Sequence, residues 1–146
     1  DESEHNFKFS LVEGDLPKTD MGWEIFPNGL SNVLRRLNSD YSKNKPIHIT
    51  ESGMANSDRI IKNNVDDNER ISFYSDHLKE IEALSREIPI KSYFAWSLLD
   101  NYEWAFGYQK RFGLVYVDYD DLKRIPKSSY KAFQKVLLSR HKGMNN

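Results

Sequence analysis

A glutamate at the end of a short apolar run is the first residue in this sequence whose position suggests chemistry. Residues 47–50 are rich in β-branched side chains and follow a proline, so we expect a buried strand that delivers Glu51 at its C-terminal end. Gly53 then allows a sharp turn. Parallel α/β folds build their active sites at such strand ends. Glu51 is therefore a candidate catalyst, although a strand-end carboxylate more commonly pairs with a surface lysine or caps a helix.

An aromatic segment at 93–104 supplies the second set of candidates. Trp96 and Trp104 alone would be interpreted as aromatic core packing. Glu103 directly precedes Trp104, and an ionised carboxylate in a dry core would need partners. The carboxylate therefore argues against a closed core at this point.

Two helices are expected to flank the first strand. Residues 30–41 carry apolar side chains at helical spacing, and Asn28 is available as their N-cap. Residues 66–87 begin with capping-box spacing between Asp66 and Glu69 and continue with one apolar face.

The C-terminal half should add two strands and a helix. Pro89 ends the preceding helix and opens a strand at 90–96, and the alternation over 112–119 predicts a further strand before a turn at Asp120 and Asp121. Ser128 is expected to cap the last helix. Its inward side chains should be Tyr130, Phe133, Val136 and Leu137. Helices alternating with strands imply a parallel sheet, but two certain strands are too few to close one.

Composition narrows the classes of protein that fit. The 146 residues include 21 basic and 22 acidic side chains, mixed along the chain, which gives no reason to expect a nucleic-acid or membrane partner. Cysteine is absent, so disulfides, thiolate metal sites and cysteine nucleophiles are excluded. The histidines lack metal-ligand spacing, and His48 is expected to be a hydrogen-bonded interior group. We expect no metal, no cofactor and a cytoplasmic protein whose first residue, Asp1, could be internal to a longer product.

Four motifs in order along the chain resemble signatures of the β-glucosidases of glycoside hydrolase family one. They are Ile49–Gly53 (ITESG), Trp96–Trp104 (WSLLDNYEW), Arg111–Leu114 (RFGL) and Leu122–Ser128 (LKRIPKS). The similarity runs from about Gly22 to Phe133. It implies an α/β fold, the C-terminal part of a (β/α)8 TIM barrel, with the seventh strand at 47–50 and the eighth at 90–96. Residues 1–146 would form a single segment, the C-terminal third of the barrel domain.

The resemblance also implies a chemistry. Glu51 matches the nucleophile of a retaining β-glycosidase, whose acid/base partner stands roughly 5–5.5 Å away. In the family that partner belongs to a Thr-x-Asn-Glu-Pro motif, which this sequence lacks. Ser52 departs from the asparagine that usually follows the nucleophile. The chain would therefore hold only the nucleophile of the catalytic pair. The serine beside it puts the fine positioning of the Glu51 carboxylate in doubt.

Sugar-binding roles are implied for four further residues. Trp96, Glu103 and Trp104 resemble residues that line the family's sugar pocket, where indoles and a carboxylate suit the apolar faces and hydroxyls of a sugar. Tyr108 resembles an aromatic residue at the pocket mouth, with packing as an equal alternative. Because the pattern assigns Glu103 to binding, Glu51 and Glu103 are not interpreted as the catalytic pair.

Two functions remain open. The first is a retaining β-glycosidase acting on unphosphorylated β-glucosides or β-galactosides, because relatives specific for phosphorylated sugars usually have serine at Glu103 and tyrosine at Phe112. Its partner would be the remainder of the barrel, from a longer chain or a companion subunit. The alternative is a non-catalytic carbohydrate-binding or scaffold remnant of the same fold. Retention of Glu51 favours the hydrolase.

Overall fold

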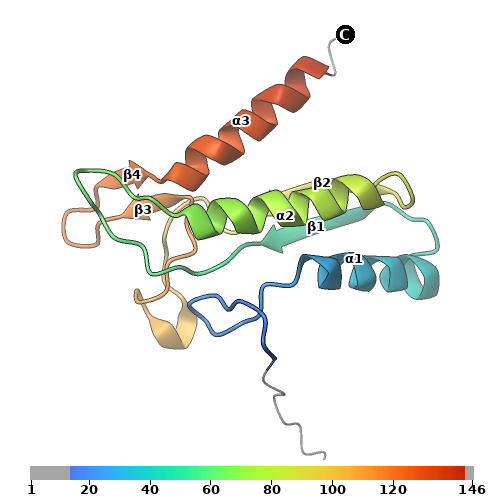
Figure 1. The fold of residues 1–146 in the computed structure, drawn as a ribbon, viewed down its shortest axis with the longest axis horizontal. Coiled ribbons are helices and arrows are strands. Elements are labelled where there is room, and N and C mark those ends of the chain that lie inside the picture. Colours follow the sequence, from blue (N-terminus) through green and yellow to red (C-terminus); the bar gives the residue numbers. More distant parts are fainter. Residues whose placement is uncertain (1–13, 144–146) are drawn as a thin grey trace, which may run out of the picture.

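A computed structural model describes residues 14–143 of the chain (Figure 1). Its elements are α1 (Pro27–Arg36), η1 (Leu37–Ser42), β1 (Ile47–Ser52), α2 (Asn68–Leu84), β2 (Ile90–Ala95), η2 (Trp104–Phe106), β3 (Val115–Val117), β4 (Arg124–Pro126) and α3 (Ser128–Gly143). The strands form two pairs, a parallel pair of β1 with β2 and an antiparallel pair of β3 with β4. None of the described helices is long and apolar enough to cross a membrane.

The parallel pair confirms the two strands expected from the apolar runs. Ile47 of β1 lies opposite Ile90 of β2, and Ser52 lies opposite Ala95. Along β1, buried Ile47 and Ile49 alternate with exposed His48 and Thr50. Successive side chains of a strand point to opposite faces, so one face of the strand pair is covered and the other is open. The covered face packs against α1 and α2 in one apolar cluster, formed by Leu34, Ile47, Ile49, Ile81, Leu84 and Ile88.

The first helix starts at Pro27, two residues earlier than an N-cap at Asn28 implies. Pro27 occupies its first turn, where the missing N–H is no loss, and Phe26 stands at the N-cap without a side-chain hydrogen bond. The prediction that Asn28 is the N-cap is therefore wrong. Helical structure continues through the π-helical turn η1 and ends at Lys43, whose backbone is left-handed at φ 47°.

The second helix has a different start and end from those expected. Asp67 stands at its N-cap, and no side chain there bonds to the helix, so the capping box from Asp66 to Glu69 is absent. The Asp67 carboxylate instead accepts hydrogen bonds from the backbone N–H and the hydroxyl of Ser129. The helix ends at Leu84, three residues before Glu87. Tertiary polar contacts have thus replaced the local cap.

The expected strand at 112–119 is shorter in the structure. Only Val115–Val117 is a strand, paired with Arg124–Pro126, and the expected turn at Asp120 and Asp121 connects the two. Residues just before β3 bond elsewhere: the Leu114 N–H donates to the Ser97 carbonyl (2.8 Å), and the Ser97 N–H donates to the Phe112 carbonyl (3.2 Å). These bonds hold 112–114 against the segment that follows β2.

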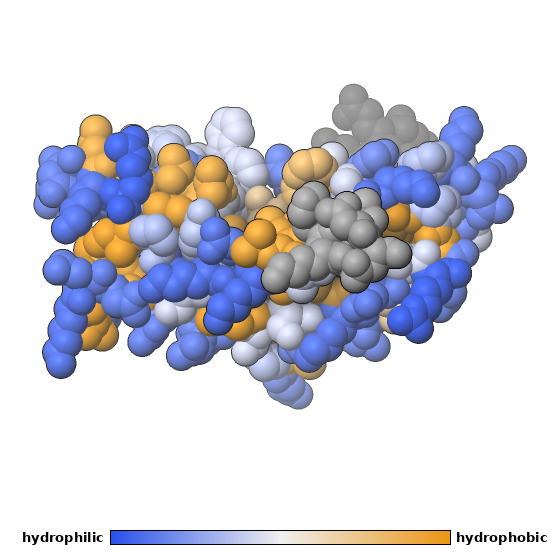
Figure 2. Space-filling view, turned by 90° about the horizontal axis from the view of Figure 1, so that it is seen from above, coloured by the Kyte–Doolittle hydropathy of each residue, from blue (hydrophilic) through white to orange (hydrophobic). Residues whose placement is uncertain are grey.

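The last helix is Ser128–Gly143 and projects beyond the rest of the structure (Figure 1). Ser128, which was expected to cap it, lies inside the helix, and its hydroxyl donates to Asp66 Oδ1 (2.7 Å). Tyr130 and Phe133 pack against a second apolar cluster built on Met54, Phe73, Tyr74 and Leu114. Val136 and Leu137, which were expected to face inward, are exposed. They line an apolar groove of about 510 Å³ between α2 and α3. Viewed from the side of α3, hydrophobic side chains are visible between charged ones (Figure 2).

Candidate active site

An open pocket lies where β1 and β2 end, beside η2. Its volume is about 330 Å³. It is lined by Trp23, Glu51, Ser52, Gly53, Trp96, Glu103, Trp104 and Phe112. The structure therefore brings together four of the five residues selected from the sequence, Glu51 from the end of β1 and the other three from the segment that follows β2.

Glu51 is exposed in this pocket at the C-terminal end of β1. Among the side chains described, those of residues 14–139, no hydrogen bond or ion pair joins its carboxylate to another side chain or to a helix end. The commoner arrangements for a strand-end glutamate, a lysine partner or a cap, do not occur there. The carboxylate is free to contact a molecule in the pocket.

Close contact between the two strand ends forms the floor of the pocket. The Trp96 N–H donates to the Ser52 carbonyl (2.8 Å), and the Tyr74 hydroxyl donates to the Trp96 carbonyl (3.2 Å). A Cβ on Gly53 would lie 1.8 Å from the Trp96 carbonyl oxygen, far inside contact distance. Only glycine therefore allows this approach, which brings Glu51 beside Trp96. The sharp turn expected at Gly53 is not present: residues 53–55 form no turn, and it is the lack of a side chain that is needed. The peptide bond between Trp96 and Ser97 is cis.

Ser52, the residue that departs from the family pattern, is tied to the neighbouring strand. The Tyr93 hydroxyl donates to the Ser52 hydroxyl oxygen at 2.9 Å. Burial is the main cause that raises the pKa of Tyr93 to about 12, so its phenol stays protonated and remains a donor at neutral pH. The side chain next to Glu51 thus has a fixed partner on β2.

The two tryptophans are surface residues of the pocket. Trp96 is 37% exposed and Trp104 is 83% exposed, so neither belongs to an aromatic core. Trp104 opens η2 with a left-handed backbone at φ 40°, an uncommon conformation for a bulky residue. The Glu103 N–H donates to the Gly107 carbonyl (2.7 Å), which closes the turn below both side chains. The turn presents an indole and a carboxylate side by side.

Tyr108, the fifth residue selected from the sequence, is not among the residues that line the pocket. Its ring contacts those of Tyr102 (centroids 5.3 Å apart) and Tyr119 (4.4 Å). It is exposed on this aromatic group, so its role at a pocket mouth stays a prediction.

The sequence of the chain matches the model of a known protein family. The model of glycosyl hydrolase family 1 matches residues 2–142. The chain belongs to glycosyl hydrolase family 1. The match extends beyond the range from Gly22 to Phe133 over which the motifs suggested a resemblance, and it confirms the resemblance.

Relatives in family 1 agree with this assignment. Beta-glucosidase A of Thermotoga maritima is 48% identical over 124 residues, which are 84% of this chain and 28% of that protein. The 1,4-beta-D-glucan glucohydrolase of Thermotoga neapolitana is 44% identical over 132 residues, 89% of this chain and 30% of that protein. The chain thus spans less than a third of the length of these relatives.

Solved structures of family 1 show the same fold. The beta-glucosidase of Exiguobacterium antarcticum B7 superposes with a TM-score of 0.87 at 40% identity, covering 90% of this chain and 29% of that one. The Thermotoga maritima enzyme superposes with a TM-score of 0.85 at 45% identity, and the match covers 88% of this chain and 29% of that one. The fold is that of the C-terminal part of the family's (β/α)8 barrel, as the motifs implied.

Four residues that line the pocket were not selected as site residues from the sequence: Trp23, Ser52, Gly53 and Phe112. Trp23 lies in an irregular segment, where no periodicity marks it, and its ring packs on that of Phe112 with centroids 6.1 Å apart. The only sequence feature that could have indicated Trp23 is its position at the start of the region that resembles family 1. The segment before Trp23 is held by Asp20, whose carboxylate pairs with Lys110 (3.2 Å) and whose N–H donates to the Ala55 carbonyl (3.0 Å).

His48 differs partly from the expectation. Its Nδ1 atom lies 2.7 Å from the Ser92 hydroxyl, so it is hydrogen-bonded within the strand pair, but its side chain is exposed and not interior. Among the described side chains of residues 14–139, no group of three or more acidic or histidine residues is arranged to hold a metal ion.

Proposed function

We propose that this chain carries the nucleophile and part of the sugar pocket of a retaining β-glycosidase. The observation that carries the proposal is the position of Glu51, an exposed carboxylate without a protein partner among the described residues, at a strand end beside two indoles and a second carboxylate. Membership of family 1 supports the same role.

Glu51 acts on the anomeric carbon. One of its oxygens bonds to this carbon while the bond to the aglycone oxygen breaks and that oxygen takes a proton from a separate acid. Water then attacks the same carbon, gives a proton to the acid's conjugate base, and releases Glu51 and the sugar with retained configuration. The acid/base carboxylate, at roughly 5–5.5 Å, comes from a part of the barrel that this chain does not contain.

Glu103, Trp96 and Trp104 hold the sugar. The Glu103 carboxylate accepts hydrogen bonds from sugar hydroxyls, and the indoles offer apolar faces and N–H donors. Two carboxylates repel a phosphorylated sugar. The nearby Lys110 is already paired with Asp20, which limits its use as a phosphate ligand. The substrate is an unphosphorylated β-glucoside or β-galactoside.

The remaining barrel completes the enzyme. Residues 1–146 form the C-terminal third of one barrel domain, and a longer chain or a companion subunit supplies the other strands. Support comes from the coverage of 28–30% of the relatives and from a single parallel strand pair within residues 14–143, since an eight-stranded barrel must close on itself.

The test uses this chain assembled with the rest of a family 1 barrel and a chromogenic β-glucoside. Glu51→Gln should abolish turnover but keep binding of castanospermine, a compound seen in complex with the Thermotoga maritima enzyme. Asp76→Asn, on the exposed surface of α2, should leave both unchanged.

Two outcomes contradict the proposal in different ways. Unchanged turnover in Glu51→Gln removes the nucleophile role from this residue. Castanospermine binding by an assembled wild-type protein that hydrolyses no glycoside supports a carbohydrate-binding remnant instead.

A further inference from the structure

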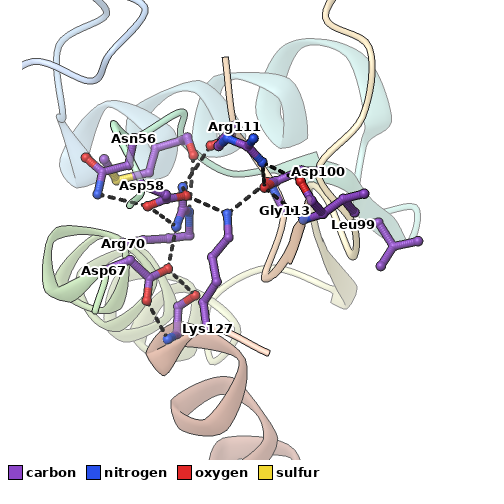
Figure 3. Close-up of polar contacts among 12 residues, drawn as sticks. Asn56, Asp58, Asp67, Arg70, Leu99, Asp100, Arg111, Gly113 and Lys127 are labelled. Atoms are coloured by element: carbon purple, nitrogen blue, oxygen red, sulfur yellow. Dashed lines mark hydrogen bonds and ion pairs between the residues drawn. The ribbon is translucent and has the colours of Figure 1, made fainter. Parts of the chain in front are cut away.

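A cluster of charged side chains, buried or nearly so, connects the segments that follow β1 and β2 (Figure 3). It contains three cations and three carboxylates, so its formal charge is zero. The members are Arg70, Arg111, Lys127, Asp58, Asp67 and Asp100. Five of these side chains are fully buried and Arg111 is 15% exposed. None of them lines the pocket.

Lys127 joins the two halves of this cluster. Its ammonium group donates to Asp100 Oδ1 at 2.8 Å and also to Asp58 Oδ2. Its own backbone N–H donates to the Leu114 carbonyl (3.0 Å), and the adjacent Ser129 N–H donates to Asp67 (2.8 Å). Lys127 is therefore fixed at its main chain as well as at its tip.

Asp58 connects Lys127 to the segment that carries Glu51. The Asp58 carboxylate also accepts from Arg70 Nη2 (2.8 Å), and Arg70 Nε donates to the carbonyl of Met54 (3.4 Å). Met54 follows Glu51 by three residues, directly after the close approach at Gly53. The cluster thus holds the chain where it leaves β1.

Asp100 connects Lys127 to two further pocket segments. It stands between Trp96 and Glu103 in the sequence, and its carboxylate accepts from the Gly113 N–H (2.8 Å) and from Arg111 Nη1 (2.7 Å). A Cβ on Gly113 would lie 2.2 Å from the Asp100 backbone nitrogen, so the two segments are in tight contact. Gly113 follows Phe112, which lines the pocket.

Three of the four chain segments that line the pocket, those of Glu51, Trp96–Trp104 and Phe112, are therefore attached to the cluster. A lysine in such a place is unfavourable by itself, and burial is the main cause that lowers the pKa of Lys127. An apolar side chain of similar size would fill the space without that penalty. Apolar packing is non-directional, whereas two hydrogen bonds from one ammonium group define where two carboxylates stand.

We propose that Lys127 is a positioning residue for the pocket: by bridging Asp58 and Asp100 it sets where Glu51 stands relative to Trp96 and Glu103. The inference rests on the proposed function only where it concerns the effect of Lys127 on catalysis. The effect of Lys127 on the geometry of the pocket can be measured without any turnover.

The tryptophans make that measurement possible. The sequence contains three, and Trp23, Trp96 and Trp104 all line the pocket. Fluorine NMR of the full chain labelled with fluorotryptophan therefore reports the pocket alone, with resonances assigned through single Trp→Phe variants. Lys127→Met should move or split the Trp96 resonance by more than its linewidth. Lys123→Met, which removes an exposed lysine in the β3–β4 turn, should leave the spectrum unchanged.

Kinetics provide the second measurement. In the barrel assembled from this chain and its complement, Lys127→Met should lower kcat/KM roughly 10²-fold, because small displacements of reacting groups have effects of that size. The loss should fall mainly on kcat. An assembled wild type without turnover contradicts the proposed function, while the NMR result still decides the role of Lys127.

Three results overturn the inference. The first is a folded Lys127→Met chain whose Trp96 resonance does not move, and the second is an unchanged kcat/KM in an active assembly. If Lys127→Met does not fold, Asp100→Asn is judged by the same resonance, since its amide keeps the shape of the carboxylate. Failure of both variants to fold is the third result, because the cluster would then serve stability alone.

Discussion

The side chain beside the candidate nucleophile depends on one hydrogen bond between strands. Ser52 accepts from the Tyr93 hydroxyl, and this bond links β1 to β2 within one residue of Glu51. The phenol can donate only while it is protonated. Burial, which raises the pKa of Tyr93 to about 12, therefore also protects the contact against moderate alkali.

Alkaline unfolding tests the state of Tyr93. Its pKa is 10.0 in the unfolded chain and about 12 in the folded one, so between these values only the folded state keeps the proton. The free energy of unfolding should then fall as the pH rises. Tyr93→Phe should flatten this slope, by up to about 1.4 kcal/mol per pH unit, in urea unfolding curves. Tyr41→Phe, at an exposed tyrosine, is the control, and a slope equal to wild type in Tyr93→Phe contradicts the prediction.

The second carboxylate of the pocket leads to a prediction about affinity. Glu103→Ala in the assembled barrel should weaken castanospermine binding between about 10-fold and about 100-fold, since hydrogen bonds to a charged group contribute about 1.5–3 kcal/mol. Calorimetric titration measures this change, and circular dichroism of the variant checks the fold. Unaltered affinity would remove Glu103 from the sugar site.

At the scale of elements, the pocket depends on how closely two strand ends approach. Gly53→Ala would place a methyl group 1.8 Å from the Trp96 carbonyl oxygen, so β1 and β2 must separate there. We expect a loss of about 1–3 kcal/mol from overpacking, together with a shifted Trp96 resonance. Urea unfolding measures the first effect and fluorine NMR the second.

Gly22→Ala is the matched control for this prediction. Gly22 has a left-handed backbone at φ 77°, but no atom lies within 4 Å of the position that its Cβ would take. The control therefore includes backbone strain of about 1–2 kcal/mol without the collision, and should leave Trp96 unmoved. Equal Trp96 shifts in both variants would contradict the role given to Gly53.

Elements with strong periodicity were predictable from the sequence, and their ends were not. The apolar runs that became β1 and β2 and the helical face of α2 are local signals, and the structure confirms them. The capping box of α2 failed because the Asp67 carboxylate bonds to Ser129, a residue 62 positions away whose proximity no local pattern reveals.

The same contrast holds for the site. Glu51 was found because it ends a strand and lies in a motif, and Trp96, Glu103 and Trp104 because of a motif alone. Trp23 carries no periodic signal, and the bridging role of Lys127 appears only when Asp58 and Asp100 are seen together. Contacts between distant segments are what the sequence patterns leave out.

At the scale of the whole molecule, an opening larger and more apolar than the candidate active site lies elsewhere on the surface. It is the groove between α2 and α3, into which Val136 and Leu137 project. Among the described residues, β2 pairs with β1 alone. An apolar groove and an unpaired strand edge both favour association with other polypeptides.

Sedimentation of the 146-residue chain tests this surface. We expect mass to increase with concentration, and Leu137→Glu should reduce the association because a charge in the groove opposes burial. Leu122→Glu is the matched control, since Leu122 and Leu137 are both 56% exposed but only Leu137 lines the groove. A monomer at all concentrations, or equal effects of both substitutions, would contradict the prediction.

The position of the ion pairs has a consequence for the medium in which the molecule works. The pairs of Arg35 with Glu87 and of Asp76 with Lys79 lie at the surface, where dissolved ions weaken them. Dissolved ions do not reach Lys127 between Asp58 and Asp100. We therefore expect the strand ends to stay joined in concentrated brine, and the shape of the pocket to depend little on ionic strength.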